Sequence, residues 1–150
     1  MKQLLMLLAM GALIAGCAGR TAMYDAPDKD ADVAVVGVDN QITEESSGGE
    51  GGWQAPGSSQ GTRAGVFKVD GERTNEMGGE DKARLRPGKH SIEVFADSAG
   101  SLRFGELEYK FEAGKTYSVR LYRNKTEDTD YRAELVNTAN PDTVLEEVNF

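Results

Sequence analysis

The sequence predicts an all-β protein, an antiparallel β-sandwich of about seven to eight short strands. Val, Leu, Phe and Tyr recur at alternating positions, which is the period of a strand with one buried face. Turn-forming pairs such as Asp70-Gly71 and Pro87-Gly88 separate these segments at intervals of roughly ten residues. No segment between them has the period of an amphipathic helix, so a helical bundle is not expected.

The first predicted strands lie on either side of a glycine- and serine-rich segment. The apolar run Asp32–Val38 has the length and β-branched content of a buried strand. Residues 43–61 are too poor in apolar side chains to offset the entropy of ordering, so they predict a long mobile loop. Ala64–Val69 predicts a strand that ends at the turn Asp70-Gly71, and a second polar loop is expected over Glu72–Asp81.

The next two segments predict a hairpin. Lys82–Arg86 and His90–Ala96 flank Pro87-Gly88, a pair that favours a tight turn. A two-residue loop there would place Leu85 opposite His90 and Ala83 opposite Ile92. That register puts the apolar residues of both strands on one face.

A second hairpin is predicted around Glu112-Ala113-Gly114, where Gly114 supplies a left-handed residue. It would set Tyr109 opposite Tyr117 and Leu107 opposite Val119, with charged residues on the other face. Gly105, just before the first of these strands, is expected to mark a β-bulge. Two more strands are predicted at Tyr131–Val136 and Thr143–Val148, separated by a turn at residues 140–142.

The chain begins with a segment typical of a secretory signal peptide. Lys2 is followed by an apolar run from Leu4 to Ala15, which is too short to remain as a membrane-spanning helix. Leu13-Ile14-Ala15-Gly16-Cys17 resembles the lipobox of bacterial lipoproteins. The resemblance implies cleavage before Cys17, a diacylglycerol on its sulfur and an acyl chain such as palmitate on its new amine. Because Cys17 is the sole cysteine, no intramolecular disulfide is possible.

The lipobox resemblance also predicts where the protein is located. The residue after Cys17 is Ala18 and not Asp, which in such lipoproteins implies sorting to the outer membrane with the domain facing the periplasm. In a host with one membrane, the same signal implies the outer face of the plasma membrane. The predicted organisation is therefore a signal peptide over residues 1–16, a lipidated cysteine and flexible tether over 17–30, and a β-sandwich over 31–150.

Three segments in this order resemble the small PEGA-like β-sandwich domains of envelope lipoproteins: Val69-Asp70-Gly71, the run from Leu85 to Val94, and the run from Phe111 to Val119. The resemblance covers about Ala64 to Arg123, and the Pro-Glu-Gly-Ala tetrapeptide that names the PEGA domain is absent. It implies an immunoglobulin-like or transthyretin-like sandwich without catalytic residues.

The sequence offers little that is typical of an enzyme. Gly57-Ser58-Ser59-Gln60-Gly61 matches the pattern of a hydrolase nucleophile elbow, but it lacks the strand before and the helix after that Ser59 would need. His90, the sole histidine, falls on a predicted strand face, and a zinc site of the usual spacing lacks its second His or Cys. We expect neither catalysis nor a cofactor.

Two acidic clusters are candidates for a cation site. Asp28, Asp30 and Asp32 recur at every second position, and Glu127 is followed by Asp128 and Asp130. Neither cluster has the glycine at position six and the glutamate at position twelve that an EF-hand loop needs. Solvated acidic loops are the expected structure, and no metal site is predicted.

Trp53, Arg120 and Tyr122 are the candidate binding residues. Trp53 is the sole Trp and lies in the predicted loop, where it either folds back onto a sheet or anchors a partner. Arg120 and Tyr122, with Arg123, either meet an anionic partner or form a solvated sheet face paired with Glu106 and Glu108.

Together these observations predict a non-catalytic, lipid-anchored accessory or interaction module of the cell envelope. Its contact would be made by the Trp53 loop or by an exposed sheet edge that adds a strand from a partner protein. A net charge of −8 argues against binding to nucleic acid and against docking on anionic lipid by charge. The alternative is a domain that binds a glycan, a peptidoglycan fragment or a cation.

Overall fold

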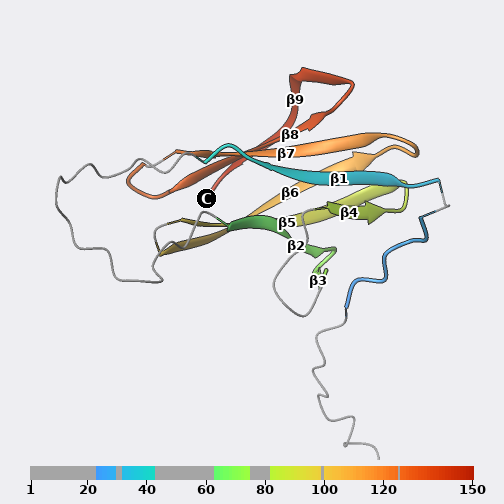
Figure 1. The fold of residues 1–150 in the computed structure, drawn as a ribbon, viewed down its shortest axis with the longest axis horizontal. Helices are drawn as coiled ribbons and strands as arrows, with labels where there is room; N and C mark the ends of the chain where they lie inside the picture. The colour runs from blue at the N-terminus through green and yellow to red at the C-terminus, as the bar shows by residue number, and fades with distance from the viewer. Residues whose placement is uncertain (1–22, 30–31, 43–62, 75–81, 99, 125) are drawn as a thin grey trace, which may run out of the picture.

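The computed structural model describes residues 23–29, 32–42, 63–74, 82–98, 100–124 and 126–150. These residues form two β-sheets that pack face to face, with no helix in the described ranges (Figure 1). The predicted β-sandwich is therefore confirmed. Nine strands are present among the described residues, and one of them, β3, has only two residues.

The larger sheet has five strands in the order β4-β1-β7-β8-β9. Its β1–β7 pair is parallel, which the sequence analysis did not anticipate, and its other pairs are antiparallel. The strands are β1 (Ala34–Asn40), β4 (Lys82–Leu85), β7 (Thr116–Arg123), β8 (Tyr131–Asn137) and β9 (Asn140–Asn149).

The smaller sheet has four antiparallel strands in the order β3-β2-β5-β6. They are β2 (Arg63–Val69), β3 (Glu72–Arg73), β5 (Gly88–Ser98) and β6 (Ser101–Phe111). Glu72 and Arg73, in a segment whose sequence predicts a loop, thus add a short edge strand to this sheet.

The core lies between the two sheets and is built from alternate residues of the longer strands. Tyr131 and Leu85 are fully buried there, whereas the edge strand β9 contributes only the half-buried Leu145 and Val148. The side chains with the largest buried volume are Tyr131, Phe111, Leu85, Ile92, Leu107, Leu121 and Leu135.

Both predicted hairpins are wrong about strand partners. β4 pairs with β1 in the larger sheet, while β5 pairs with β2 and β6 in the smaller sheet, so the chain crosses between sheets at Pro87. Leu85 and Ile92 do face the core, as expected. A hairpin and a crossover both direct the same alternate residues to the interior, so alternation alone does not distinguish them.

The segment around Gly114 is a second crossover of the same kind. β6 ends in the smaller sheet and β7 begins in the larger one, so Tyr109 and Tyr117 meet across the core with ring centroids 5.8 Å apart. The turn itself is as predicted, because Gly114 has φ +71° and the Lys115 N–H donates to the Glu112 carbonyl at 3.3 Å. Only the placement of the two strands differs.

The turn between β8 and β9 lies earlier than predicted. Thr138 and Ala139 form it, and Asn140 already pairs with Asn137. The register then shifts, so that Val136 opposes Val144 and Pro141 lies in an irregular part of the edge strand. A proline has no N–H to donate to a ladder, and an irregular edge accommodates it.

Gly105 is not at a bulge, because the β5–β6 register runs without interruption from Ser98–Ser101 to Gly88–Phe111. The ring of Phe150 instead lies on Gly105, and a Cβ at this glycine would be 2.5 Å from the Phe150 Cδ1 atom. The bulge in this sheet is in β2, between Val66 and Lys68.

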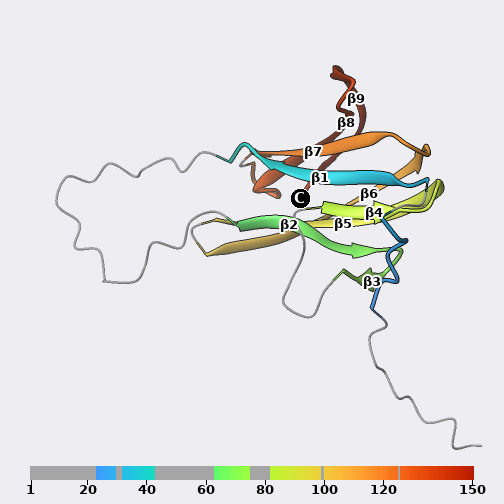
Figure 2. The same ribbon diagram turned by 45° about the vertical axis from the view of Figure 1, so that its right-hand side comes forward.

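Part of the segment predicted to be a flexible tether, residues 17–30, is bonded to the two sheets. Met23 forms a β-bridge to Arg73, and the Tyr24 N–H donates to the Arg73 carbonyl at 2.8 Å. Pro27 is buried, and its carbonyl accepts a hydrogen bond from Arg84 Nε at 2.9 Å. Residues 23–27 therefore belong to the folded domain and lie along the edges formed by β3 and β4 (Figure 2).

Candidate interaction surface

Several predicted site residues lie outside the described part of the chain: Cys17, Trp53, Ser59 and the whole glycine-rich segment 43–61. Their roles remain predictions. The structure does describe Arg120, Tyr122, His90 and most of the two acidic clusters.

Arg120 and Tyr122 lie on β7, on the outer face of the larger sheet. Arg120 Nη2 donates to the Pro141 carbonyl at 2.7 Å and lies 3.8 Å from a Glu134 carboxylate oxygen. Arg132 joins Glu134 to Glu147 with two contacts of 2.7 Å. This face is thus a network of paired charges.

The carboxylates expected beside Arg120 were the wrong ones. Glu106 and Glu108 lie on β6 in the opposite sheet. Arg120 faces Glu134 instead because β8, and not β6, is the strand beside β7. A charged sheet face was foreseen, but its pairs depend on a strand order that the sequence does not reveal.

His90 is held at both ring nitrogens. Nδ1 lies 2.6 Å from Asp70 Oδ2, and Nε2 lies 2.7 Å from the Arg86 carbonyl oxygen. Asp70 also accepts a hydrogen bond from the Ser91 N–H at 3.0 Å. The imidazole therefore ties the β2–β3 turn to the crossover between β4 and β5, and neither nitrogen is directed at a substrate.

The described members of the acidic clusters do not converge on a cation site. Asp130 accepts a hydrogen bond from Ser101 Oγ at 2.6 Å and pairs with Arg103 Nε at 3.1 Å. Asp30, in the other cluster, lies outside the described residues. Within the described ranges, no group of three or more His, Cys, Asp or Glu side chains is placed to hold a metal ion.

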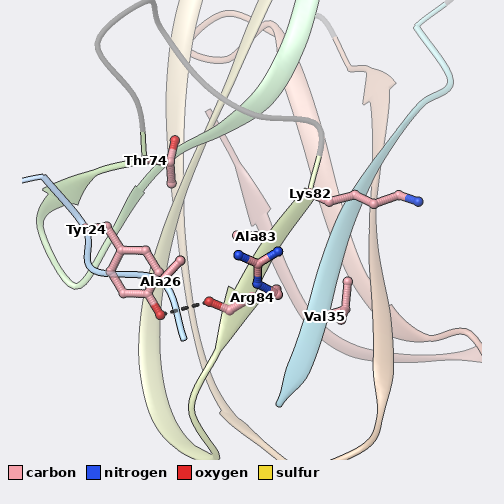
Figure 3. Close-up of a pocket in the computed structure, with 7 residues that line it drawn as sticks. All are labelled: Tyr24, Ala26, Val35, Thr74, Lys82, Ala83 and Arg84. Carbon is pink, nitrogen blue, oxygen red and sulfur yellow. Dashed lines mark hydrogen bonds between the residues drawn. The ribbon is translucent and has the colours of Figure 1, made fainter. Parts of the chain in front are cut away.

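One cavity of about 380 Å³ lies beside the N-terminal segment, between β3 and β4 (Figure 3). Tyr24, Thr74, Arg84 and Val35 line it. The Tyr24 hydroxyl donates to the Arg84 carbonyl at 2.9 Å, and the Thr74 hydroxyl donates to the Val66 carbonyl at 2.8 Å. Burial raises the pKa of Tyr24, which keeps its hydroxyl protonated as a donor. Both hydroxyls thus hold the fold together.

The outer face of the smaller sheet carries the most unusual surface, which we call the outer aromatic face: Phe67, Phe95, Leu102 and Phe104. Phe95 on β5 pairs with Phe104 on β6 and with Gly65 on β2. The bulge in β2 is at Phe67, and the ring centroids of Phe67 and Phe104 are 5.0 Å apart. Leu102 and Phe104 are 45% and 44% exposed, so this contact does not bury the patch.

Basic side chains border this apolar face on the β3 side. Lys68 Nζ lies 5.1 Å and the Arg73 guanidinium carbon 5.0 Å from the centre of the Phe67 ring, both within cation–π range. Lys68 also pairs with Glu93 at 2.9 Å. Among the described residues, Arg73 forms no ion pair with a carboxylate, so its charge remains on the rim of the patch.

Sequence reasoning missed this surface, although one signal for it was present. Leu102 and Phe104 are at even positions of β6, whereas the inward residues Leu107 and Phe111 are at odd positions. Large apolar residues on both faces of one strand indicate that both faces have apolar contacts. Phe67 gave no such signal, because a bulge depends on the partner strand.

Comparisons with models of protein families, with curated proteins and with solved structures found no match to this chain. The resemblances to lipoproteins and to PEGA-like domains therefore remain predictions. In the described part of the chain, no helix has both the length and the apolar character needed to cross a bilayer.

Proposed function

We propose that this chain is a non-catalytic, lipid-anchored module of the cell envelope that works by contact through its outer aromatic face. The observation that carries the proposal is the exposure of Phe104 and Leu102 beside Phe67 and Phe95. Exposed apolar groups that cluster on a folded domain mark interaction sites more often than isolated ones do. The flat shape suits a surface partner better than an enclosed small molecule.

The anchor is proposed from the segment that ends in Cys17. A basic residue, a short apolar run and small residues before the cysteine favour cleavage there and acylation of Cys17. Two or more acyl chains hold a protein stably on a bilayer, because each buried methylene contributes about 0.8 kcal/mol. We place the domain at the periplasmic face of the outer membrane, or at the outer face of the plasma membrane in a host with one membrane.

A non-catalytic role is supported by the described candidates for chemistry. His90 Nδ1 contacts Asp70 and His90 Nε2 contacts the Arg86 carbonyl, so the imidazole supports the fold. The cavity beside Tyr24 has its hydroxyl groups bonded to backbone carbonyls. Neither arrangement presents a nucleophile with an adjacent base, which acyl transfer would need.

The anchor can be tested in cells of the native host with the chain and a Cys17→Ser variant. We expect the mature wild-type protein to begin at an acylated Cys17 and to fractionate with membranes, as seen by mass spectrometry of its N-terminal peptide. The variant should lack the lipid and should leave the membrane fraction. An unmodified Cys17 in the wild-type protein would refute the proposal.

A further inference from the structure

We infer that the outer aromatic face rests on the lipid bilayer that holds the Cys17 anchor, as a second point of membrane contact. This inference rests on the proposed lipid anchor and goes further by naming the partner of the surface. It is argued from the length of the tether, from where the tether joins the domain and from the chemistry of the two outer faces.

The tether is short because the domain begins earlier than the sequence suggested. Met23 is bridged to Arg73, and the Tyr24 N–H and Pro27 carbonyl are hydrogen-bonded to β3 and β4. Six residue steps separate Cys17 from Met23. Even fully extended, they span about 20 Å, so the lipid anchor cannot be far from Arg73.

The tether also joins the domain beside the outer aromatic face. Arg73, the residue to which Met23 is bridged, has its guanidinium carbon 5.0 Å from the centre of the Phe67 ring. Met23 is itself 43% exposed. The described N-terminal segment runs along the β3 edge of the smaller sheet and on towards β4 (Figure 2). The short tether therefore joins the domain at the sheet edge where Arg73 borders the outer aromatic face.

The composition of the outer aromatic face suits the boundary between lipid headgroups and acyl chains. Aromatic rings and a leucine can enter the apolar region, while Lys68 and Arg73 at the rim keep their charges in the polar layer. Ion pairs occur on both outer faces, Lys68–Glu93 and Arg63–Asp97 on the smaller sheet and Arg120–Glu134 on the larger sheet, but the exposed pair Leu102 and Phe104 lies on the smaller one. The exposed apolar pair on one face thus gives the domain a preferred orientation.

The net charge of −8 indicates that charge attraction does not drive this contact. Burial of a few apolar side chains gives only weak membrane binding to an untethered domain. The short tether changes this, because it keeps the face at a high effective concentration near the bilayer. The contact is therefore expected in the lipidated protein and is expected to be weak in the Cys17→Ser chain.

The test places a single Trp on each outer face of the mature, lipidated chain. Trp53→Phe removes the native Trp, and Phe104→Trp or the matched control Tyr122→Trp adds one to the smaller or the larger sheet. Each protein is reconstituted into phosphatidylcholine vesicles with or without bromine on the acyl chains. We expect brominated lipid to quench Phe104→Trp emission and to leave Tyr122→Trp emission unchanged.

The possible results separate the anchor from the face. Flotation of the protein with vesicles reports the anchor, and loss of flotation would refute the proposed function itself. If the protein floats but Phe104→Trp emission is not quenched, the membrane contact is refuted and the anchor is not. Equal quenching of Phe104→Trp and Tyr122→Trp would have the same meaning. Leu102→Trp serves as a second probe if Phe104→Trp does not fold. The face would be assigned to a protein partner instead if quenching is absent in vesicles and Phe104 is cross-linked to an envelope protein in cells.

Discussion

The contact between Gly105 and Phe150 gives the sharpest prediction about stability. A methyl group at Gly105 would lie 2.5, 2.8 and 2.9 Å from the Cδ1, Cγ and Cε1 atoms of Phe150. These separations are far below van der Waals contact, and the ring edge cannot yield as a flexible chain end would. Gly105→Ala should therefore displace the Phe150 ring from β6 and from Tyr131, whose ring centroid is 5.7 Å away.

The expected magnitude follows from two opposing effects. Truncation of a fully buried Phe costs about 3–5 kcal/mol, so displacement of the half-buried Phe150 should cost about 2 kcal/mol. Alanine in a strand is better than glycine by roughly 0.5–1 kcal/mol, because glycine loses more backbone entropy on folding. Gly105→Ala should thus lower the free energy of unfolding by about 1 kcal/mol, and Phe150→Ala by about 2 kcal/mol.

In the Phe150→Ala chain, Gly105→Ala should have the opposite effect on the free energy of unfolding. Without the Phe150 ring, nothing opposes the methyl group, and Gly105→Ala should raise the free energy of unfolding by roughly 0.5–1 kcal/mol. Urea denaturation of the four proteins, in a Cys17→Ser background, measures this double-mutant cycle. If Gly105→Ala destabilises the Phe150→Ala chain as much as it destabilises the parent, the ring contact is not the reason that glycine is needed.

Three further predictions concern bonds that join separate elements. Tyr131→Phe removes the 2.6 Å hydrogen bond to the Ser101 carbonyl and should cost about 1–3 kcal/mol in urea denaturation; an unchanged midpoint would contradict this. His90→Ala removes the 2.6 Å contact with Asp70 and should lower the free energy of unfolding by about 1–3 kcal/mol in the same assay. An unchanged free energy of unfolding would show that this contact does not stabilise the fold. Burial raises the pKa of Tyr24, so its contribution to stability should be fully present below the ordinary tyrosine pKa, near 10, and should be lost as pH rises above it. Tyr24→Phe should flatten that alkaline fall, measured by urea midpoints at pH values on either side of about 10.

The face to which each strand directs its apolar residues could be predicted from the sequence, because it is a local property. Ile92, Val94 and Ala96 alternate in β5, and all three are buried. The turns at Asp70-Gly71 and Gly114 were also predictable, because their positive φ values need residues that tolerate this conformation.

The strand order could not be predicted, because it depends on pairs that are distant in sequence. β1 lies between β4 and β7, which follow it by dozens of residues, and its pairing with β7 is parallel. The crossovers at Pro87 and Gly114 carry the same turn signals as hairpins. Without the strand order, Arg120 could not be matched to Glu134, and the pairing with Glu106 and Glu108 was wrong.

The outer aromatic face was only partly accessible to sequence reasoning, for a related reason. Leu102 and Phe104 could have been assigned to one face from the alternation in β6 alone. The contribution of Phe67 from β2 arises from a bulge and from a ring contact that spans β5. A surface assembled across three strands requires their register, which single-strand periodicity does not contain.

The two outer faces of the sandwich differ in a way that the fold itself does not require. Both sheets must bury one face, and either outer face could be polar. Both outer faces carry ion pairs, such as Arg120–Glu134 and Lys68–Glu93, but the smaller sheet also exposes Phe104 and Leu102. An exposed apolar patch promotes aggregation in a freely diffusing protein, whereas the proposed membrane tether would keep the patch facing the bilayer. The asymmetry is therefore better explained by a domain held close to a membrane than by one that tumbles freely in solution.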